Sequence, residues 1–139
     1  MRSNKTDGYH ENGGFGSRRF FARLLNEQEN PIYIGIHMNK FPEEKYKGLQ
    51  VYYSKSNEKS KELALNVQKN TYTYIQKDNK RVPKAADSSI YVLSSLDCPA
   101  ILVECGFMSN TEELALLKTE EYRRNVSAVI FISSLSVEP

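Results

Sequence analysis

Two short apolar runs, each followed by an ionisable residue, constrain the fold of this chain more than any other feature. Residues 32–36 read Ile-Tyr-Ile-Gly-Ile and precede His37, and residues 100–103 read Ala-Ile-Leu-Val and precede Glu104. Runs this short, with β-branched and aromatic residues, are typical of buried strands rather than helices. We therefore expect a buried strand at each of these positions.

Segments with helical spacing of apolar residues separate and flank these strands. Ser17 is a suitable N-cap for a first helix. Asn110 and Glu113 partly match a capping box, which places a helix start just before Leu114. A last helix carries its apolar stripe from Tyr122 to Ile130. The helices are expected over residues 17–26, about 56–71, about 110–117 and from about 120 onward.

Further strands are expected at Leu49–Tyr53 and Ile90–Leu93, with a polar surface loop over residues 76–89 between them. Strands that alternate with helices indicate an α/β domain with a largely parallel sheet flanked by helices. Such a domain usually opens with a strand, but this sequence opens with Gly-rich coil and a helix. Four strands are also fewer than the usual five or six. We therefore expect the sheet to lack its first strand or strands in this chain.

Composition narrows the class of protein. The chain has 139 residues, of which 40% are hydrophobic, so it can bury one modest core. Its 19 Lys and Arg against 17 Asp and Glu leave a net charge of +2, which argues against a nucleic-acid partner. No apolar run is long enough for a membrane span, and no apolar segment near Met1 resembles a secretory signal.

The two cysteines are not expected to pair. A strand separates Cys98 from Cys105, and an odd spacing places them on opposite faces of it. Seven extended residues span roughly 23 Å, whereas a disulfide needs Cα atoms within about 7 Å. We expect both to be small buried hydrophobic residues, with a nucleophilic cysteine as the alternative.

His37 and Glu104 are the candidate functional residues because ligands collect outside the carboxyl ends of strands in open α/β sheets. If the two strands are parallel neighbours, both side chains reach the same crevice. A histidine there can bind zinc, and a carboxylate can take a proton from water. A hydrogen-bonded structural role remains open for His37, whereas an unpaired buried carboxylate costs several kcal/mol and is harder to explain structurally.

Three motifs resemble those of the zinc-dependent N-acetylmuramoyl-L-alanine amidases of the amidase-3 family. Residues 35–39, Gly-Ile-His-Met-Asn, resemble the family's Ser-Ile-His-x-Asn signature. Residues 102–110 resemble its Val-Glu-x-Gly-Phe-x-Ser-Asn segment, and residues 47–53 are similar to its Gly-x-Gln-x-Phe-Tyr strand. The resemblance runs from about Gly16 to Val129. Phe41-Pro42 and residues 46–50, Tyr-Lys-Gly-Leu-Gln, are most similar to the spore-cortex amidases.

This resemblance implies a peptidoglycan hydrolase that cleaves the amide bond between N-acetylmuramic acid and L-alanine, in cell-wall remodelling, sporulation or germination. It implies action outside the cytoplasm, at the cell wall or spore cortex. The family binds zinc through His, Glu and His. By the match, His37 is the second histidine, and Glu104 is the acid/base that activates water and passes a proton to the leaving amine. Asn39 and Gln50 would be orienting residues.

The family's opening His-Gly-Gly strand and its glutamate ligand have no counterpart here, and His10 does not follow a strand. Two of the three zinc ligands are therefore expected to be absent. The resemblance implies that residues 1–139 are the C-terminal portion of a single amidase-3-like catalytic domain, inactive or nearly so by itself. A non-catalytic module that binds peptidoglycan or a protein partner is the alternative. A bare sheet edge would also allow a dimer.

Overall fold

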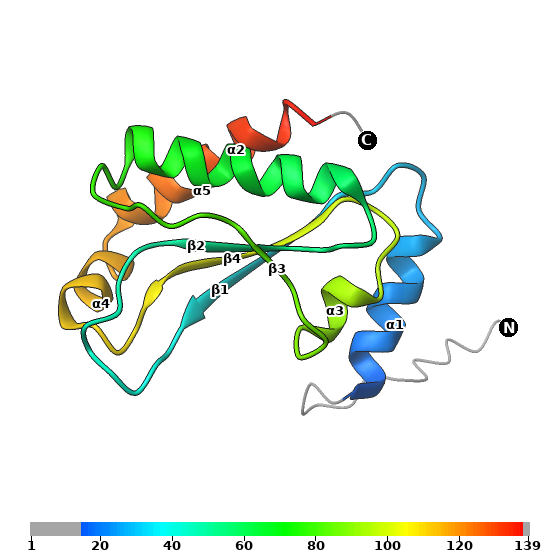
Figure 1. Ribbon diagram of the computed structural model, residues 1–139, viewed down its shortest axis with the longest axis horizontal. Coiled ribbons are helices and arrows are strands. Elements are labelled where there is room, and N and C mark those ends of the chain that lie inside the picture. The colour runs from blue at the N-terminus through cyan, green and yellow to red at the C-terminus, as the bar shows by residue number, and fades with distance from the viewer. Residues whose placement is uncertain (1–14, 138–139) are drawn as a thin grey trace, which may run out of the picture.

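The computed structural model describes residues 15–137 and contains one four-stranded sheet in the order β1-β4-β2-β3 (Figure 1). The strands are β1 (Tyr33–Asn39), β2 (Gln50–Tyr53), β3 (Lys84–Ala85) and β4 (Ala100–Phe107). The helices are α1 (Phe15–Asn26), α2 (Glu58–Tyr74), α3 (Tyr91–Ser94), α4 (Thr111–Leu117) and α5 (Glu120–Ser134). β4 pairs parallel with β1 and antiparallel with β2, and β2 pairs parallel with β3. The expected α/β fold with a largely parallel sheet is confirmed.

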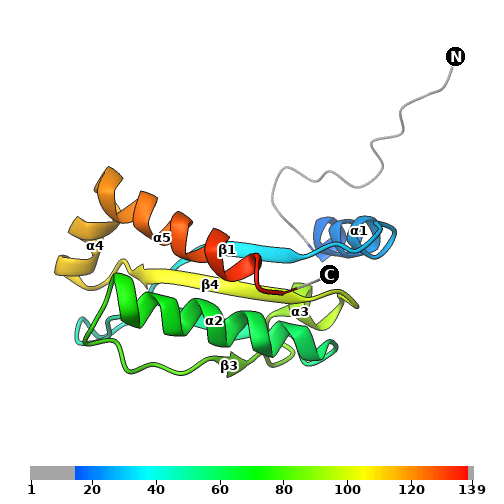
Figure 2. The same cartoon turned by 90° about the horizontal axis from the view of Figure 1, so that it is seen from above.

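The main core lies between one face of the sheet and the helices α2 and α5, which run side by side across it (Figures 1 and 2). Residues that alternate along the strands enter this core because successive side chains of a strand point to opposite faces. α5 contributes the stripe expected from the sequence. The core includes Leu49, Val51, Leu63, Val67, Ile101, Val103, Cys105, Tyr122, Val126, Val129 and Ile130.

The opposite face of the sheet carries a smaller core under α1 and α3. It includes Ala22, Leu93, Leu96, Ala100 and Leu102. Because Ala100 and Leu102 lie in the first half of β4, this core covers the beginning of the strand and leaves its later residues on that face uncovered by a helix. The candidate residues lie in this uncovered part.

Helix starts largely follow the sequence signals. The side chain of Asn57 caps α2 by accepting a bond from the Lys59 N–H at 3.0 Å, and Asn110 caps α4 in the same way through the Glu113 N–H at 3.0 Å. α1 differs from the expectation, because it begins at Phe15 and therefore contains Ser17 within the helix.

The strand expected at residues 90–93 is wrong. Tyr91–Ser94 form the helical turn α3, in which the Leu93 and Ser94 N–H groups donate to the Ile90 carbonyl. A short apolar run does not distinguish a buried strand from a buried helical turn. Here the helical turn is formed, and it buries Leu93 in the smaller core.

The fourth strand lies instead inside the segment expected to be a polar surface loop. Lys84 and Ala85 pair with Tyr52 and Tyr53 on β2, and the Ala86 N–H donates to the Tyr53 carbonyl at 2.9 Å. β1 and β3 are the two outer strands of the described sheet. No helix within residues 15–137 is long and apolar enough to cross a membrane.

Candidate functional site

His37 and Glu104 lie opposite each other on the neighbouring strands β1 and β4. The parallel register pairs the two residues directly, so their side chains share one face of the sheet. Both strands continue beyond them, with a bulge between His37 and Asn39, and the Met108 N–H donates to the Asn39 carbonyl at 2.7 Å. The expectation that these residues end their strands is therefore wrong, but the juxtaposition that it predicted is present.

Gln50 extends this pair into a row across three strands. It lies opposite Glu104 on β2, so the row reads His37, Glu104, Gln50 on the face that α1 and α3 leave uncovered. The Gln50 side chain is buried, and its amide nitrogen donates to the Val82 carbonyl at 2.8 Å and to the Val51 carbonyl at 3.1 Å. Gln50 thereby fixes the loop that contains Val82 against the sheet.

Glu104 has the electrostatics of a group that can exchange a proton. Its Oε2 atom is buried and has no hydrogen-bond partner among the described residues. Burial raises the pKa of its carboxyl group, and the neighbouring His37 opposes this shift. An acid whose pKa is raised toward neutrality is suited to general acid–base chemistry. His37 is exposed and therefore open to a ligand on the same side.

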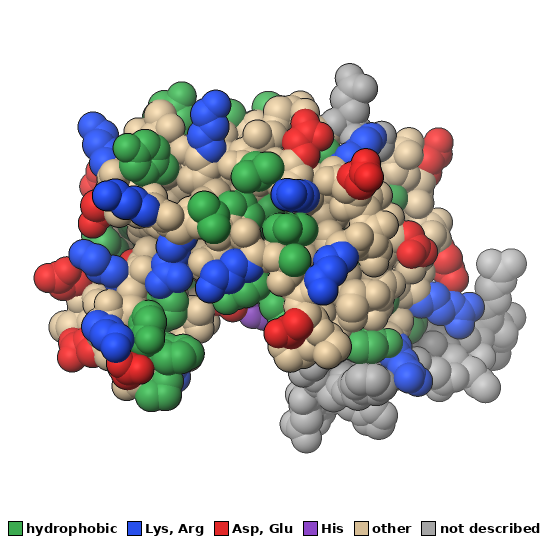
Figure 3. All heavy atoms as spheres, in the orientation of Figure 1, with side chains coloured by type: hydrophobic (Ala, Val, Ile, Leu, Met, Phe, Trp, Pro, Cys, Tyr) green, Lys and Arg blue, Asp and Glu red, His purple; other side chains and the backbone are tan. Residues whose placement is uncertain are grey.

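Figure 3 shows that the molecule is hollowed on this side. The hollow lies below the sheet in that view, between the part formed by the β1–β2 connection and α4 and the part formed by α1 and α3. His37 is exposed on this side, Glu104 is half-buried, and Gln50 is buried at the far end of the row.

The segment after β4 is held by Glu113, a role that the capping-box pattern did not predict. Its buried carboxylate accepts hydrogen bonds from the Gly48 N–H at 2.5 Å and the Phe107 N–H at 2.7 Å. Gly106 leaves room for this carboxylate, since an added Cβ would lie 3.3 Å from Glu113 Oε2. Glu113 therefore joins the β1–β2 connection to the end of β4, next to the row and on the carboxyl-terminal side of β4.

The described residues do not complete a metal centre. Within residues 15–137 no group of three His, Cys, Asp or Glu side chains is placed to hold a metal ion. His10 lies outside the described residues. His37 alone does not fit the three-ligand zinc site that the resemblance implies.

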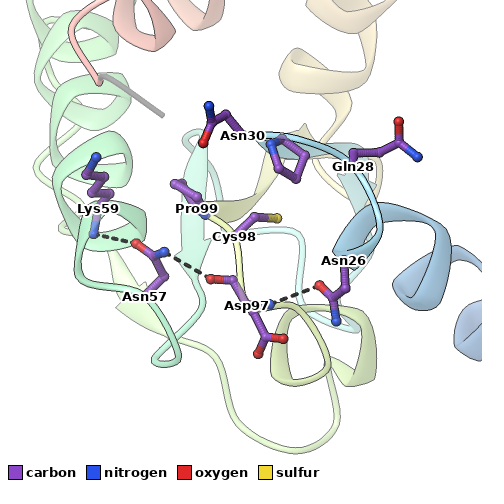
Figure 4. Close-up of a pocket in the computed structure, with 9 residues that line it drawn as sticks. Asn26, Gln28, Asn30, Asn57, Lys59, Asp97, Cys98 and Pro99 are labelled. Carbon is purple, nitrogen blue, oxygen red and sulfur yellow. Dashed lines mark hydrogen bonds between the residues drawn. The ribbon is translucent and has the colours of Figure 1, made fainter.

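The cysteines are buried free thiols, as expected. Burial raises the pKa of Cys98, and it raises the pKa of Cys105 to about 11, which disfavours the nucleophilic thiolate. Cys98 lines a hollow at the amino-terminal ends of β1 and β4 (Figure 4). There Asn57 donates to the Asp97 carbonyl at 3.0 Å and Asn26 accepts from the Asp97 N–H at 3.2 Å, so these amides join α1 and α2 to the loop before β4.

Comparison with known proteins shows the family to which the chain belongs. Residues 16–132 match the family described as N-acetylmuramoyl-L-alanine amidase, amidase-3. The germination-specific N-acetylmuramoyl-L-alanine amidase of Bacillus subtilis is 28% identical over 110 residues, which are 79% of this chain and 46% of that protein. The chain thus spans about half the length of this curated relative.

Two solved structures share the fold. The CwlD amidase of Clostridioides difficile, solved in complex with the GerS lipoprotein, has a TM-score of 0.78 and 34% identity. The alignment covers 86% of this chain and 59% of CwlD. An N-acetylmuramoyl-L-alanine amidase of Clostridium difficile 630 has a TM-score of 0.74 and 28% identity, with 86% of this chain and 62% of that chain covered.

Proposed function

The chain belongs to the amidase-3 family of N-acetylmuramoyl-L-alanine amidases, and from this premise we propose that it supplies the acid/base and one metal ligand of a peptidoglycan amidase. The bond cleaved is the amide between N-acetylmuramic acid and L-alanine. The observation that carries the proposal is the row on the uncovered sheet face, in which Glu104 lies directly opposite His37.

Glu104 is the proton carrier in this proposal. Its unpartnered Oε2 takes a proton from the attacking water and then gives it to the leaving amine nitrogen. The raised pKa of Glu104 favours the second step because the protonated acid persists until the amine leaves. His37 would be one of the residues that hold zinc in a complete site, and the metal would supply polarisation of the carbonyl and of the water.

We propose that this chain is the C-terminal portion of one catalytic domain and that it is inactive, or nearly so, by itself. His37 is the single ligand that we assign among the described residues, and one ligand does not hold a catalytic zinc.

The test is release of L-alanine amino termini from purified peptidoglycan, with and without added zinc. The 139-residue chain is expected to give no turnover above the blank in either condition, and robust zinc-dependent turnover refutes its inactivity. In the complete domain, Glu104→Gln is expected to lower turnover roughly a hundred-fold or more. Glu112→Gln, an exposed carboxylate on α4, is the matched control.

A non-catalytic module that binds peptidoglycan or a protein partner is the second candidate, favoured by the incomplete metal group within residues 15–137. Glu104→Gln separates the two, because a binding module keeps its function without the acid/base. The CwlD relative was solved with a lipoprotein, which supports a protein partner for this chain as well. The free outer edge of β1 in the described sheet would suit a dimer. The substrate places the action outside the cytoplasm, at the cell wall or spore cortex.

A further inference from the structure

Arg81 lies at the end of the row formed by His37, Glu104 and Gln50. Its Nη1 donates to Gln50 Oε1 at 3.3 Å, and its Nε donates to the Lys47 carbonyl at 2.9 Å. The guanidinium also lies over the Phe107 ring, 5.0 Å from the ring centre. These three contacts come from the β1–β2 connection, β2 and β4, so the orientation of the guanidinium is fixed before any ligand binds.

Within residues 15–137, no carboxylate forms an ion pair with Arg81. A guanidinium has five N–H donors, and the bonds of Arg81 to Lys47 and Gln50 use two of its nitrogens. A half-buried cation that its neighbours fix, and that pairs with no carboxylate in the described part of the chain, is suited to bind an anionic ligand.

Arg81 and Glu104 both influence the ionisation of Tyr52 and therefore lie near the same side chain. Burial raises the pKa of the Tyr52 phenol, Glu104 raises it further, and Arg81 opposes both effects. Neighbouring strands lie about 4.8 Å apart, so a guanidinium bonded to Gln50 lies on the order of 8 Å from Glu104. An extended peptide advances about 3.4 Å per residue, and its second or third residue covers this distance.

We propose that Arg81 is a specificity-determining residue that binds a free carboxylate of the stem peptide, two to three residues beyond the amide beside Glu104. This inference rests on the proposed function, since it assumes that the peptide lies along the row. Peptidoglycan stem peptides carry such carboxylates on the residues after L-alanine. Peptidoglycan in which these carboxyl groups are amidated would then bind more weakly.

Binding tests the proposal without any need for turnover. The full 139-residue chain, labelled with ¹⁵N, is titrated by NMR with N-acetylmuramoyl-L-alanyl-D-glutamate and with the same compound bearing carboxamides in place of both glutamate carboxyl groups. The charged probe is expected to bind about fivefold more tightly, as for one partly exposed ion pair. The preference is expected to shrink at high salt because screening weakens the pair.

Variants identify the residue responsible. Arg81→Met keeps the stem that packs on Phe107 and is expected to bind both probes equally. Arg81→Lys is expected to retain part of the preference, because it keeps the charge but not the fork of donors. Lys80→Met, which removes the adjacent exposed cation, is the matched control and is expected to keep the full preference.

The outcomes separate this inference from the function on which it rests. Equal affinity of the unsubstituted chain for the two probes, or an undiminished preference in Arg81→Met, overturns the role of Arg81 and leaves the proposed substrate intact. Failure to bind either probe overturns both. If Arg81→Met does not fold, the unsubstituted chain still tests the proposal. Its preference for the charged probe, and the loss of that preference at high salt, then show whether a cation binds the carboxylate.

Discussion

Replacement of Glu113 by glutamine is expected to destabilise the fold by about 2–4 kcal/mol. The Glu113 carboxylate accepts two buried hydrogen bonds, from Gly48 and Phe107, and a bond to a charged acceptor contributes about 1.5–3 kcal/mol. Glutamine has the same shape but one acceptor oxygen, so its amide NH₂ group faces one of the two N–H donors. One bond is then lost and the other weakened.

The measurement is urea unfolding followed by far-UV circular dichroism, since the chain has no tryptophan. With a urea dependence of about 2 kcal/mol per molar, a loss of this size lowers the midpoint by roughly 1–2 M. Glu112→Gln is the matched control. It removes the same charge from the same turn of α4 but from an exposed side chain, and is expected to change stability by less than about 0.5 kcal/mol.

The reasoning fails if Glu113→Gln and Glu112→Gln unfold at the same urea concentration. That result would mean that the charge near the start of α4, rather than the two buried bonds, determines the contribution of Glu113. A change in the urea dependence itself, without a change in midpoint, would indicate an altered unfolded state and would count against it equally.

Three further predictions concern Glu104, the cysteines and Gly48. The pKa of Glu104 is raised in the folded chain, so its ionisation lowers the stability as the pH rises from the ordinary pKa through the raised one. Glu104→Gln is therefore expected to be more stable than the unsubstituted chain at neutral pH, by less than about 1 kcal/mol for this partly exposed group. In acid the two chains are expected to be equally stable. A larger stability gap in acid than at neutral pH contradicts this. Cys98 and Cys105 are expected to react with a thiol reagent at least about tenfold more slowly in the folded chain than in urea, and fast stoichiometric labelling of the folded chain contradicts their burial. Gly48→Ala is expected to cost about 1–2 kcal/mol in urea unfolding, because φ is +96° there; an unchanged midpoint would show that the turn adapts.

Local signals in the sequence located most elements of the fold. β-branched runs predicted β1 and β4, and the cap Asn110 predicted the start of α4. Such signals act over a few residues, and the strand period and cap chemistry are visible in the sequence. They failed at Ile90, where a four-residue apolar run formed a helical turn, and at the polar segment that contains β3.

The candidate site divides in the same way. The residue types and their positions after apolar runs identified His37 and Glu104 from the sequence alone. No local signal identified Arg81, which lies in a polar segment and reaches the row through bonds to Gln50 and Lys47, 31 and 34 residues away.

The sequence by itself thus determined the α/β class, the family and the two residues that the family motifs carry. The tertiary structure decided their register, the third member of the row and the loops that surround it. The physical reason is that propensities and caps depend on neighbours in the chain. By contrast, the pairing of His37 with Glu104 and the capture of the Gly48 and Phe107 N–H groups by Glu113 depend on segments far apart in the sequence.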